Sequence, residues 1–219
     1  MIKFAPQLIN LFATLILLLS FAMISQRRIV SLVNLFMLQG ATLVAASFLL
    51  AYATNQPDLY VSGALTLVLK VILIPWMLHR MIRKLNVRWD IETLLNIPTT
   101  MLVGIALVIF SFSLALPVSR LSDSIAGGSL GIALACVFLS FMMMITRSKA
   151  IPQVIGFLSM ENGLIFAATT VTNGMPMIVE FGIALDVLVG VLIMGVFMFQ
   201  IREKFDSLDI HHLETLKED

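Results

Sequence analysis

Long apolar runs separated by short polar breaks extend along nearly the whole chain. A run of about 20 apolar residues crosses a bilayer core of about 30 Å as a helix. The runs are continuous and lack the period-two alternation of a transmembrane β-barrel. We therefore predict an all-α polytopic membrane protein with about seven spans, at residues 4–25, 29–53, 59–82, 97–117, 128–146, 151–172 and 178–201.

The breaks between the runs carry the turn-forming and charged residues. They read SQRR at 25–28, NQPD at 55–58, RKLNVRWDIET at 83–93, LPVSRLSDS at 116–124, TRSK at 146–149 and NGMP at 173–176. No linker or low-complexity segment divides the chain, so one membrane domain is expected over 1–201. The polar tail, 202–219, places several leucines and an isoleucine at helical spacing. It is expected to dock at the cytoplasmic surface or to be a solvated terminus.

Composition agrees with the membrane class. Of 219 residues, 59% are hydrophobic and 12% are charged, against about 25% charged in a soluble domain. The net charge of +1 favours no nucleic-acid partner. The single cysteine, Cys136, excludes an internal disulfide and offers no ligand set for a metal or an iron–sulfur cluster. Without a Gly-rich phosphate loop or a Ser/His/Asp or Cys/His set, we expect no catalytic centre and no cofactor.

The distribution of Lys and Arg over the breaks predicts orientation. One side carries Arg27, Arg28, Arg80, Arg83, Lys84, Arg88, Arg147, Lys149, Arg202, Lys204 and Lys217, whereas the other carries Lys3 and Arg120. This bias places the N-terminus outside and the C-terminus in the cytoplasm. The first span is expected to be retained rather than cleaved as a signal peptide, because two arginines follow it and no A-x-A site is present.

Three ionisable residues fall near the centres of three different spans: Lys70, Glu161 and Asp186. Facing lipid, each would cost about 2.5–3.5 kcal/mol. We therefore expect all three to face the interior of the bundle or a partner subunit. Burial disfavours the charged form of acids and bases alike, so such groups can exchange protons. The sequence predicts a proton relay, and a static ion pair that locks the helices is the alternative.

The neighbours of these charges are small or polar. Gly182 and Gly190 flank Asp186 at i−4 and i+4, a spacing that lets another helix approach closely. On the third span Gly63 and Thr66 share a face with Lys70. Pro75 is expected to weaken the helix just beyond that lysine. Ser159, Asn162 and Gly163 surround Glu161.

Three further residues are secondary candidates. His79, near the cytoplasmic end of the third span, is either a proton entry group or a solvated interfacial side chain. Glu180, at the outer end of the seventh span, either feeds protons inward or is solvated. Gln39 takes the polar position of the second span, as Glu161 does in the sixth. This match contributes to a weak internal similarity between spans 2–3 and spans 6–7.

The stretches GFLSMENGLIF (156–166), VEFGIALDVLVGVLIMGVFM and SLDIHHLETLK, together with ALTLVLKVILIPWM around Lys70, resemble the hydrogenase-4 component E family of formate hydrogenlyase-type complexes. Spans 5–7 are also similar to the K-type subunit of complex I and the C-type subunit of Mrp antiporters. In that resemblance Asp186 corresponds to the second K-type glutamate. Glu161 falls three residues after the position of the first, where this chain has Leu158, a shift of about 4.5 Å along a helix.

The resemblance implies a proton-conducting or coupling subunit of an energy-converting redox complex in a bacterial inner membrane. Its implied partners are antiporter-like and quinone-site-like membrane subunits, and peripheral iron–sulfur and hydrogenase-like subunits. A stand-alone secondary cation transporter is one alternative, for which an inverted repeat with broken helices would be the sign. A structural anchor subunit without proton traffic is the other.

Overall fold

The computed structural model describes residues 5–84, 96–119, 126–171 and 190. Every regular element in these ranges is helical. The elements are α1 (Ala5–Ser25), α2 (Ile29–Thr54), α3 (Pro57–Thr66), the π-helical segment η2 (Leu67–Leu73), α4 (Ile74–Lys84), α5 (Ile97–Ser119), α6 (Ala126–Thr146) and α7 (Ala150–Val171). The predicted all-α class is confirmed.

Six stretches of the described residues are long and apolar enough to cross a membrane. They are Gln7–Ser25, Ile29–Thr54, Leu59–Arg80, Ile97–Pro117, Ser129–Thr146 and Ile151–Thr170. They agree with the first six predicted spans to within a few residues. The seventh predicted span, 178–201, lies outside the described residues except for Gly190, and so does the tail 202–219.

The turn between α2 and α3 forms where the NQPD signal predicts it. Asn55 adopts the left-handed conformation with φ of 58°, and its backbone N–H donates to the Ala51 carbonyl, which ends α2. Pro57 follows in the first turn of α3, where its missing N–H costs nothing. The two helices therefore run antiparallel and pack side by side.

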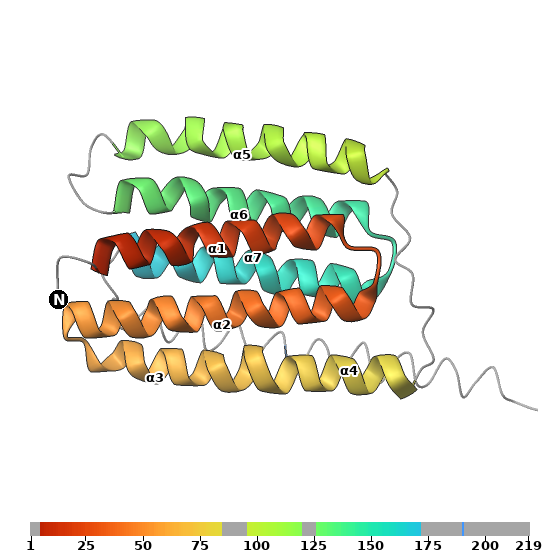
Figure 1. Ribbon diagram of the computed structural model, residues 1–219, viewed down its shortest axis with the longest axis horizontal. Helices are drawn as coiled ribbons and strands as arrows, with labels where there is room; N and C mark the ends of the chain where they lie inside the picture. The colour runs from red at the N-terminus through yellow and green to blue at the C-terminus, as the bar shows by residue number, and fades with distance from the viewer. Residues whose placement is uncertain (1–4, 85–95, 120–125, 172–189, 191–219) are drawn as a thin grey trace, which may run out of the picture.

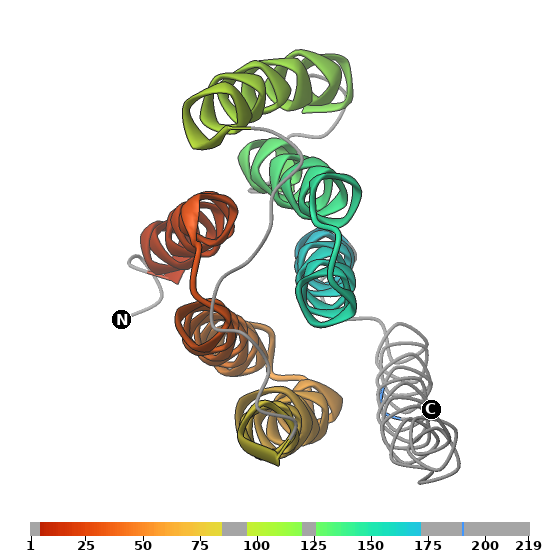
Figure 2. The same ribbon diagram turned by 90° about the vertical axis from the view of Figure 1, so that its right-hand side faces the viewer.

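The helices lie roughly parallel or antiparallel to one another (Figure 1), and they form two packed rows. Figure 2 shows α5, α6 and α7 in one row, and α1, α2 and the α3–η2–α4 span in the other. Helix α1 contacts α5 and α6, and α2 contacts both η2 and α7. The centre of the molecule is therefore where α1, α2, η2 and α7 come together.

The third span is one continuous helix that widens into a π-helical turn at its centre. The N–H of Ile74 donates to the Leu69 carbonyl, five residues earlier. The next residue, Pro75, has no N–H, and in a regular α-helix its ring would clash with the carbonyl of Val71. The wide turn relieves this conflict, and Lys70 is its central residue.

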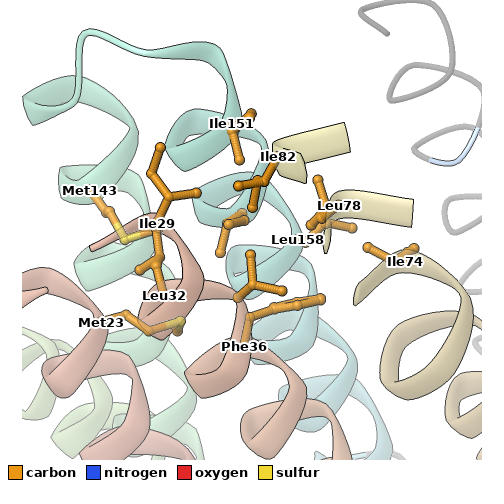
Figure 3. Packing of buried hydrophobic residues seen from close by; sticks show 12 residues of the cluster. Met23, Ile29, Leu32, Phe36, Ile74, Leu78, Ile82, Met143, Ile151 and Leu158 are labelled. Carbon is orange, nitrogen blue, oxygen red and sulfur yellow. The ribbon is translucent and has the colours of Figure 1, made fainter. Parts of the chain in front are cut away.

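Two clusters of buried apolar side chains fill the space between the rows. The first cluster comprises Met23, Ile29, Leu32, Val33, Phe36, Ile74, Leu78, Ile82, Met143, Ile151, Ile155 and Leu158 (Figure 3). The second cluster comprises Ala13, Ile16, Leu43, Ala46, Ala133, Cys136 and Phe166. Cys136 is fully buried in the second cluster, in agreement with its expected place inside the fifth span.

Two glycines bring α7 against α6. A Cβ on Gly163 would stand 3.2 Å from the Cβ of Cys136 and 3.3 Å from the backbone nitrogen of Val137. A Cβ on Gly156 would stand 3.2 Å from the Ser140 carbonyl oxygen. Between these glycines the hydroxyl oxygens of Ser140 and Ser159 lie 2.7 Å apart. This close packing fixes the rotation of α7 and therefore the direction of its other face, which carries Glu161 and Asn162.

Candidate functional site

Lys70 and Glu161 form an ion pair in the interior of the bundle. Nζ of Lys70 lies 3.3 Å from Oε2 of Glu161, and the two side chains are 0% and 3% exposed. Lys70 comes from the π-helical turn of the third span and Glu161 from the middle of α7. The prediction that these two residues face inward is confirmed.

A chain of hydrogen bonds continues from this pair through the bundle. Lys70 Nζ donates to Asn162 Oδ1 at 3.0 Å, and Asn162 Nδ2 donates to Gln39 Oε1 at 3.1 Å. Gln39 Nε2 donates to Ser20 Oγ at 2.8 Å, and Ser20 Oγ donates to the Ile16 carbonyl at 2.9 Å. Each of the four linked side chains is at most 2% exposed. We call Glu161, Lys70, Asn162, Gln39 and Ser20 the polar chain, and it joins α7, η2, α2 and α1.

The polar chain lies in a layer between the two apolar clusters. On one side Met23, Phe36, Ile74 and Leu158 of the first cluster stand three or four residues from Ser20, Gln39, Lys70 and Glu161. On the other side Ile16, Leu43 and Phe166 of the second cluster stand four residues from Ser20, Gln39 and Asn162. One helical turn is 3.6 residues. The polar groups therefore share one depth between the two apolar clusters.

Close approach of the third span to α2 brings Lys70 into this layer. A Cβ on Gly40, the neighbour of Gln39, would lie 3.6 Å from the Cβ of Lys70. At Gly40, η2 lies against α2 with ordinary van der Waals space for a Cβ, and the lysine extends past this position toward α7. Gly63 and Thr66, which were predicted to share a face with Lys70, are buried with it.

The electrostatic balance of the site depends on pairing. Two charges removed from water pay a desolvation cost that only close opposite charges and hydrogen bonds recover. Lys70 meets this condition through the Glu161 carboxylate and the Asn162 amide oxygen. The arrangement can hold a charged pair, or a neutral amine and acid after one proton moves between them.

Of the predicted site residues, the structure brings together Lys70, Glu161, Asn162 and Gln39. Ser20 was missed, because a serine in an apolar run usually bonds its own helix backbone and gives no specific signal. Asp186, Glu180 and Gly182 lie outside the described residues, so their roles stay predictions. Gly190 is half-buried, and no described residue places an atom within 4 Å of the position its Cβ would take.

His79 lies apart from the polar chain. It is half-buried in α4, and its Nδ1 lies 2.8 Å from the carbonyl oxygen of Pro75. Because a carbonyl oxygen only accepts, Nδ1 is the donor of this hydrogen bond. Its predicted role in proton entry is not tested by this geometry.

Arg147, counted in the sequence only as an orientation signal, is a buried structural cation. Its side chain is 2% exposed, and Nη2 donates to the carbonyl of Ile24 at 2.6 Å. Gln153 Nε2 donates to the carbonyl of Arg147 at 2.7 Å. Burial lowers the pKa of the Arg147 guanidinium, which nevertheless stays protonated at neutral pH. Its charge lies near the C-terminal end of α1, where a cation is favourable.

Bilayer-length helices packed around a buried ion pair and its hydrogen-bond chain define an all-α polytopic membrane protein with a polar site in its interior.

The chain is 30% identical over 204 residues to a protein of Mycobacterium tuberculosis described as "Uncharacterized protein Rv0085", with 93% of each chain covered, and it belongs to the family of that protein. Hydrogenase-4 component E of Escherichia coli K12 is 23% identical over 210 residues, 96% of this chain and 97% of that protein. The protein of the same name from Shigella flexneri has the same identity and coverage. No family model and no solved structure matches the chain.

The predicted resemblance to hydrogenase-4 component E is thus supported as a distant homology over nearly the full length. The resemblance of spans 5–7 to the K-type subunit of complex I and the C-type subunit of Mrp antiporters remains a prediction.

Proposed function

We propose that this chain is a membrane subunit of a hydrogenase-like, energy-converting redox complex and that it relays protons or transmits charge through Lys70, Glu161 and Asp186. The observation that supports this proposal best is the ion pair of Lys70 and Glu161 in the layer of polar residues between two apolar clusters. Intramembrane ionisable residues are costly and mark ion pathways by default. The distant homology to hydrogenase-4 component E supports the class of complex.

In the proposed relay, a proton on the Lys70 ammonium passes to the Glu161 carboxylate, which leaves a neutral amine and a neutral acid. The step changes no net charge, so it avoids placing an unpaired charge in the bilayer. A charge change in a neighbouring subunit would shift the balance between the two states of the pair. Asp186 is proposed as the next proton acceptor, with Glu180 and His79 as entry groups on the two sides.

We propose for this chain the setting that the resemblance to hydrogenase-4 component E implies. The partners are antiporter-like and quinone-site-like membrane subunits, with peripheral iron–sulfur and hydrogenase-like subunits that carry out the electron chemistry. The complex would lie in the bacterial inner membrane, with the C-terminus in the cytoplasm. The charge distribution supports this orientation. Arginines and lysines of the predicted cytoplasmic side lie beside the C-terminal ends of α1, α4 and α6 and the N-terminal ends of α2 and α7.

The first test is purification of the C-terminally tagged chain in mild detergent, followed by mass spectrometry of what co-purifies. We expect antiporter-like and iron–sulfur subunits. Recovery of a homo-oligomer free of such subunits would contradict the proposal and favour a stand-alone cation transporter.

The second test is proton translocation by membrane vesicles that contain the complex, driven by its electron donor. Glu161→Gln and Asp186→Asn should each lower the number of protons moved per electron pair while electron transfer continues. Asp58→Asn, in the NQPD break outside the predicted spans, is the matched control and should have little effect. If Glu161→Gln and Asp186→Asn leave translocation unchanged and lower only the amount of assembled complex, the chain is a structural anchor.

A further inference from the structure

The donors of the polar chain all point the same way, from Lys70 toward α1. Lys70 donates to Asn162, Asn162 to Gln39, Gln39 to Ser20, and Ser20 to the backbone carbonyl of Ile16. The two ends explain this order. An ammonium group only donates and a carbonyl oxygen only accepts, so while Lys70 is charged every link between them must run from the lysine to the carbonyl.

The two amides between these ends are each able to point either way. If Asn162 turned over, it would direct its NH₂ group at the Lys70 ammonium, which cannot accept a hydrogen bond. If Gln39 turned over, it would direct its NH₂ group at that of Asn162. Neither amide is more than 2% exposed, so no surface water can repair such a mismatch. The ammonium therefore sets the order from one end, and the observed orientation keeps Gln39 Nε2 bonded only if an acceptor stands beside it at the other end.

Ser20 is the member that completes the chain. Its hydroxyl accepts from Gln39 Nε2 and donates to the Ile16 carbonyl, so one rotatable group serves both bonds. The thiol of Cys136 on α6 also lies beside Ser20, but a thiol is a weak hydrogen-bonding partner. Without the Ser20 hydroxyl, Gln39 Nε2 loses this acceptor and the preference for the observed orientation weakens along the whole chain.

We propose that Ser20 is a positioning residue for the Lys70–Glu161 pair: its hydroxyl holds the Gln39 and Asn162 amides so that Asn162 presents its oxygen to the Lys70 ammonium. Ser20 lies on α1 and acts on the pair through two intervening side chains, Gln39 on α2 and Asn162 on α7. The consequence for proton transfer rests on the proposed function, whereas the energetic coupling of Ser20 to Lys70 does not.

The test is a double-mutant cycle on the full-length chain, with unfolding measured in mixed detergent micelles. In the wild-type background, Ser20→Ala should shift the unfolding equilibrium about 5- to 150-fold toward the unfolded state, as expected for a buried amide N–H left without its acceptor. In a Lys70→Met background the donor-only end is gone and both amides are free to turn over. In that background, Ser20→Ala should shift the unfolding equilibrium by a factor that is at least about threefold smaller than in the wild-type background. A difference of this size exceeds the deviation from additivity expected of distant, independent sites.

Two controls separate positioning from local packing. Ser20→Thr keeps the hydroxyl and should restore the coupling to Lys70. Ser140→Ala removes another buried hydroxyl that bonds across a helix interface but lies outside the polar chain, and its effect should not depend on Lys70. If Ser20→Ala does not accumulate, Ser20→Cys, with a weak acceptor in the same place, replaces it in the cycle.

Equal effects of the Ser20 substitution in both backgrounds would overturn the proposal, and so would failure of Ser20→Thr to restore the coupling. These outcomes are independent of the proposed function, which instead fails if Glu161→Gln leaves proton translocation unchanged. If both proposals hold, Ser20→Ala should lower the number of protons moved per electron pair, and Ser20→Thr should restore it.

Discussion

The ammonium of Lys70 and the carboxylate of Glu161 face each other inside the bundle, with Nζ 3.3 Å from Oε2. The two residues belong to opposite rows of helices, so the pair joins the rows at their centre. Removing one member of such a buried pair leaves an unpaired charge and is strongly destabilising. Replacing both members by apolar residues costs much less. Its stability effects can therefore be separated by substituting one partner or both.

Lys70→Met should destabilise the protein by about 3–5 kcal/mol, because a buried carboxylate loses the cation beside it. Protonation of Glu161 would reduce this loss of stability, because the unpaired charge is then removed. The double variant Lys70→Met/Glu161→Met should be less damaging than the sum of the single variants, since no charge is then left behind. Thermal unfolding in detergent micelles measures all three variants. Strict additivity of the two substitutions would contradict a direct interaction between the side chains.

Arg147→Met should destabilise the protein by about 1–3 kcal/mol, because the Ile24 carbonyl at the end of α1 loses its donor. Lys149→Met is the matched control, since it removes a less buried cation from the same turn. The midpoint of unfolding in detergent, compared for the two variants, gives the result. A larger effect of the Lys149 variant would show that charge near the surface, rather than the buried guanidinium, stabilises this end of the bundle.

Gly163→Ala should destabilise the α6–α7 contact by about 1–3 kcal/mol, because the added methyl group meets the Val137 backbone at 3.3 Å and the Cys136 Cβ at 3.2 Å. Gly40→Ala, whose Cβ would have no contact closer than 3.4 Å, should be neutral or slightly stabilising through its better helix propensity. Both can be compared by thermal unfolding. Equal tolerance of alanine at the two positions would contradict close packing of α6 against α7 at Gly163.

Pro75→Ala should weaken the interaction between Lys70 and Glu161. Alanine supplies the missing N–H and removes the ring, so the third span can close into a regular α-helix without the wide turn. The rotation of Lys70 relative to α7 then changes. A double-mutant cycle between Lys70 and Glu161 in the Pro75→Ala background should show a smaller coupling free energy than in the wild-type background. An unchanged coupling would mean that packing against α2, rather than Pro75, sets the position of Lys70.

The sequence by itself determined the class of protein, the first six spans and the inward direction of Lys70 and Glu161. These follow from physical costs that are local in the chain: bilayer thickness sets the length of each apolar run, and a charge at the middle of a run cannot face lipid. Gly63 and Thr66 were also placed correctly, because helical spacing puts them on the face of the lysine.

Only the tertiary structure decided which groups meet. It selected Glu161 as a partner of Lys70, brought in Gln39 and Ser20 from two other helices, and buried Arg147 against the end of α1. These contacts depend on the rotation and depth of each helix. Those are set by close approaches such as Gly163 to Val137, and by the π-helical turn around Lys70. A single sequence carries the spacing within a helix but not the register between helices, so Ser20 could not be told from any other serine in an apolar run.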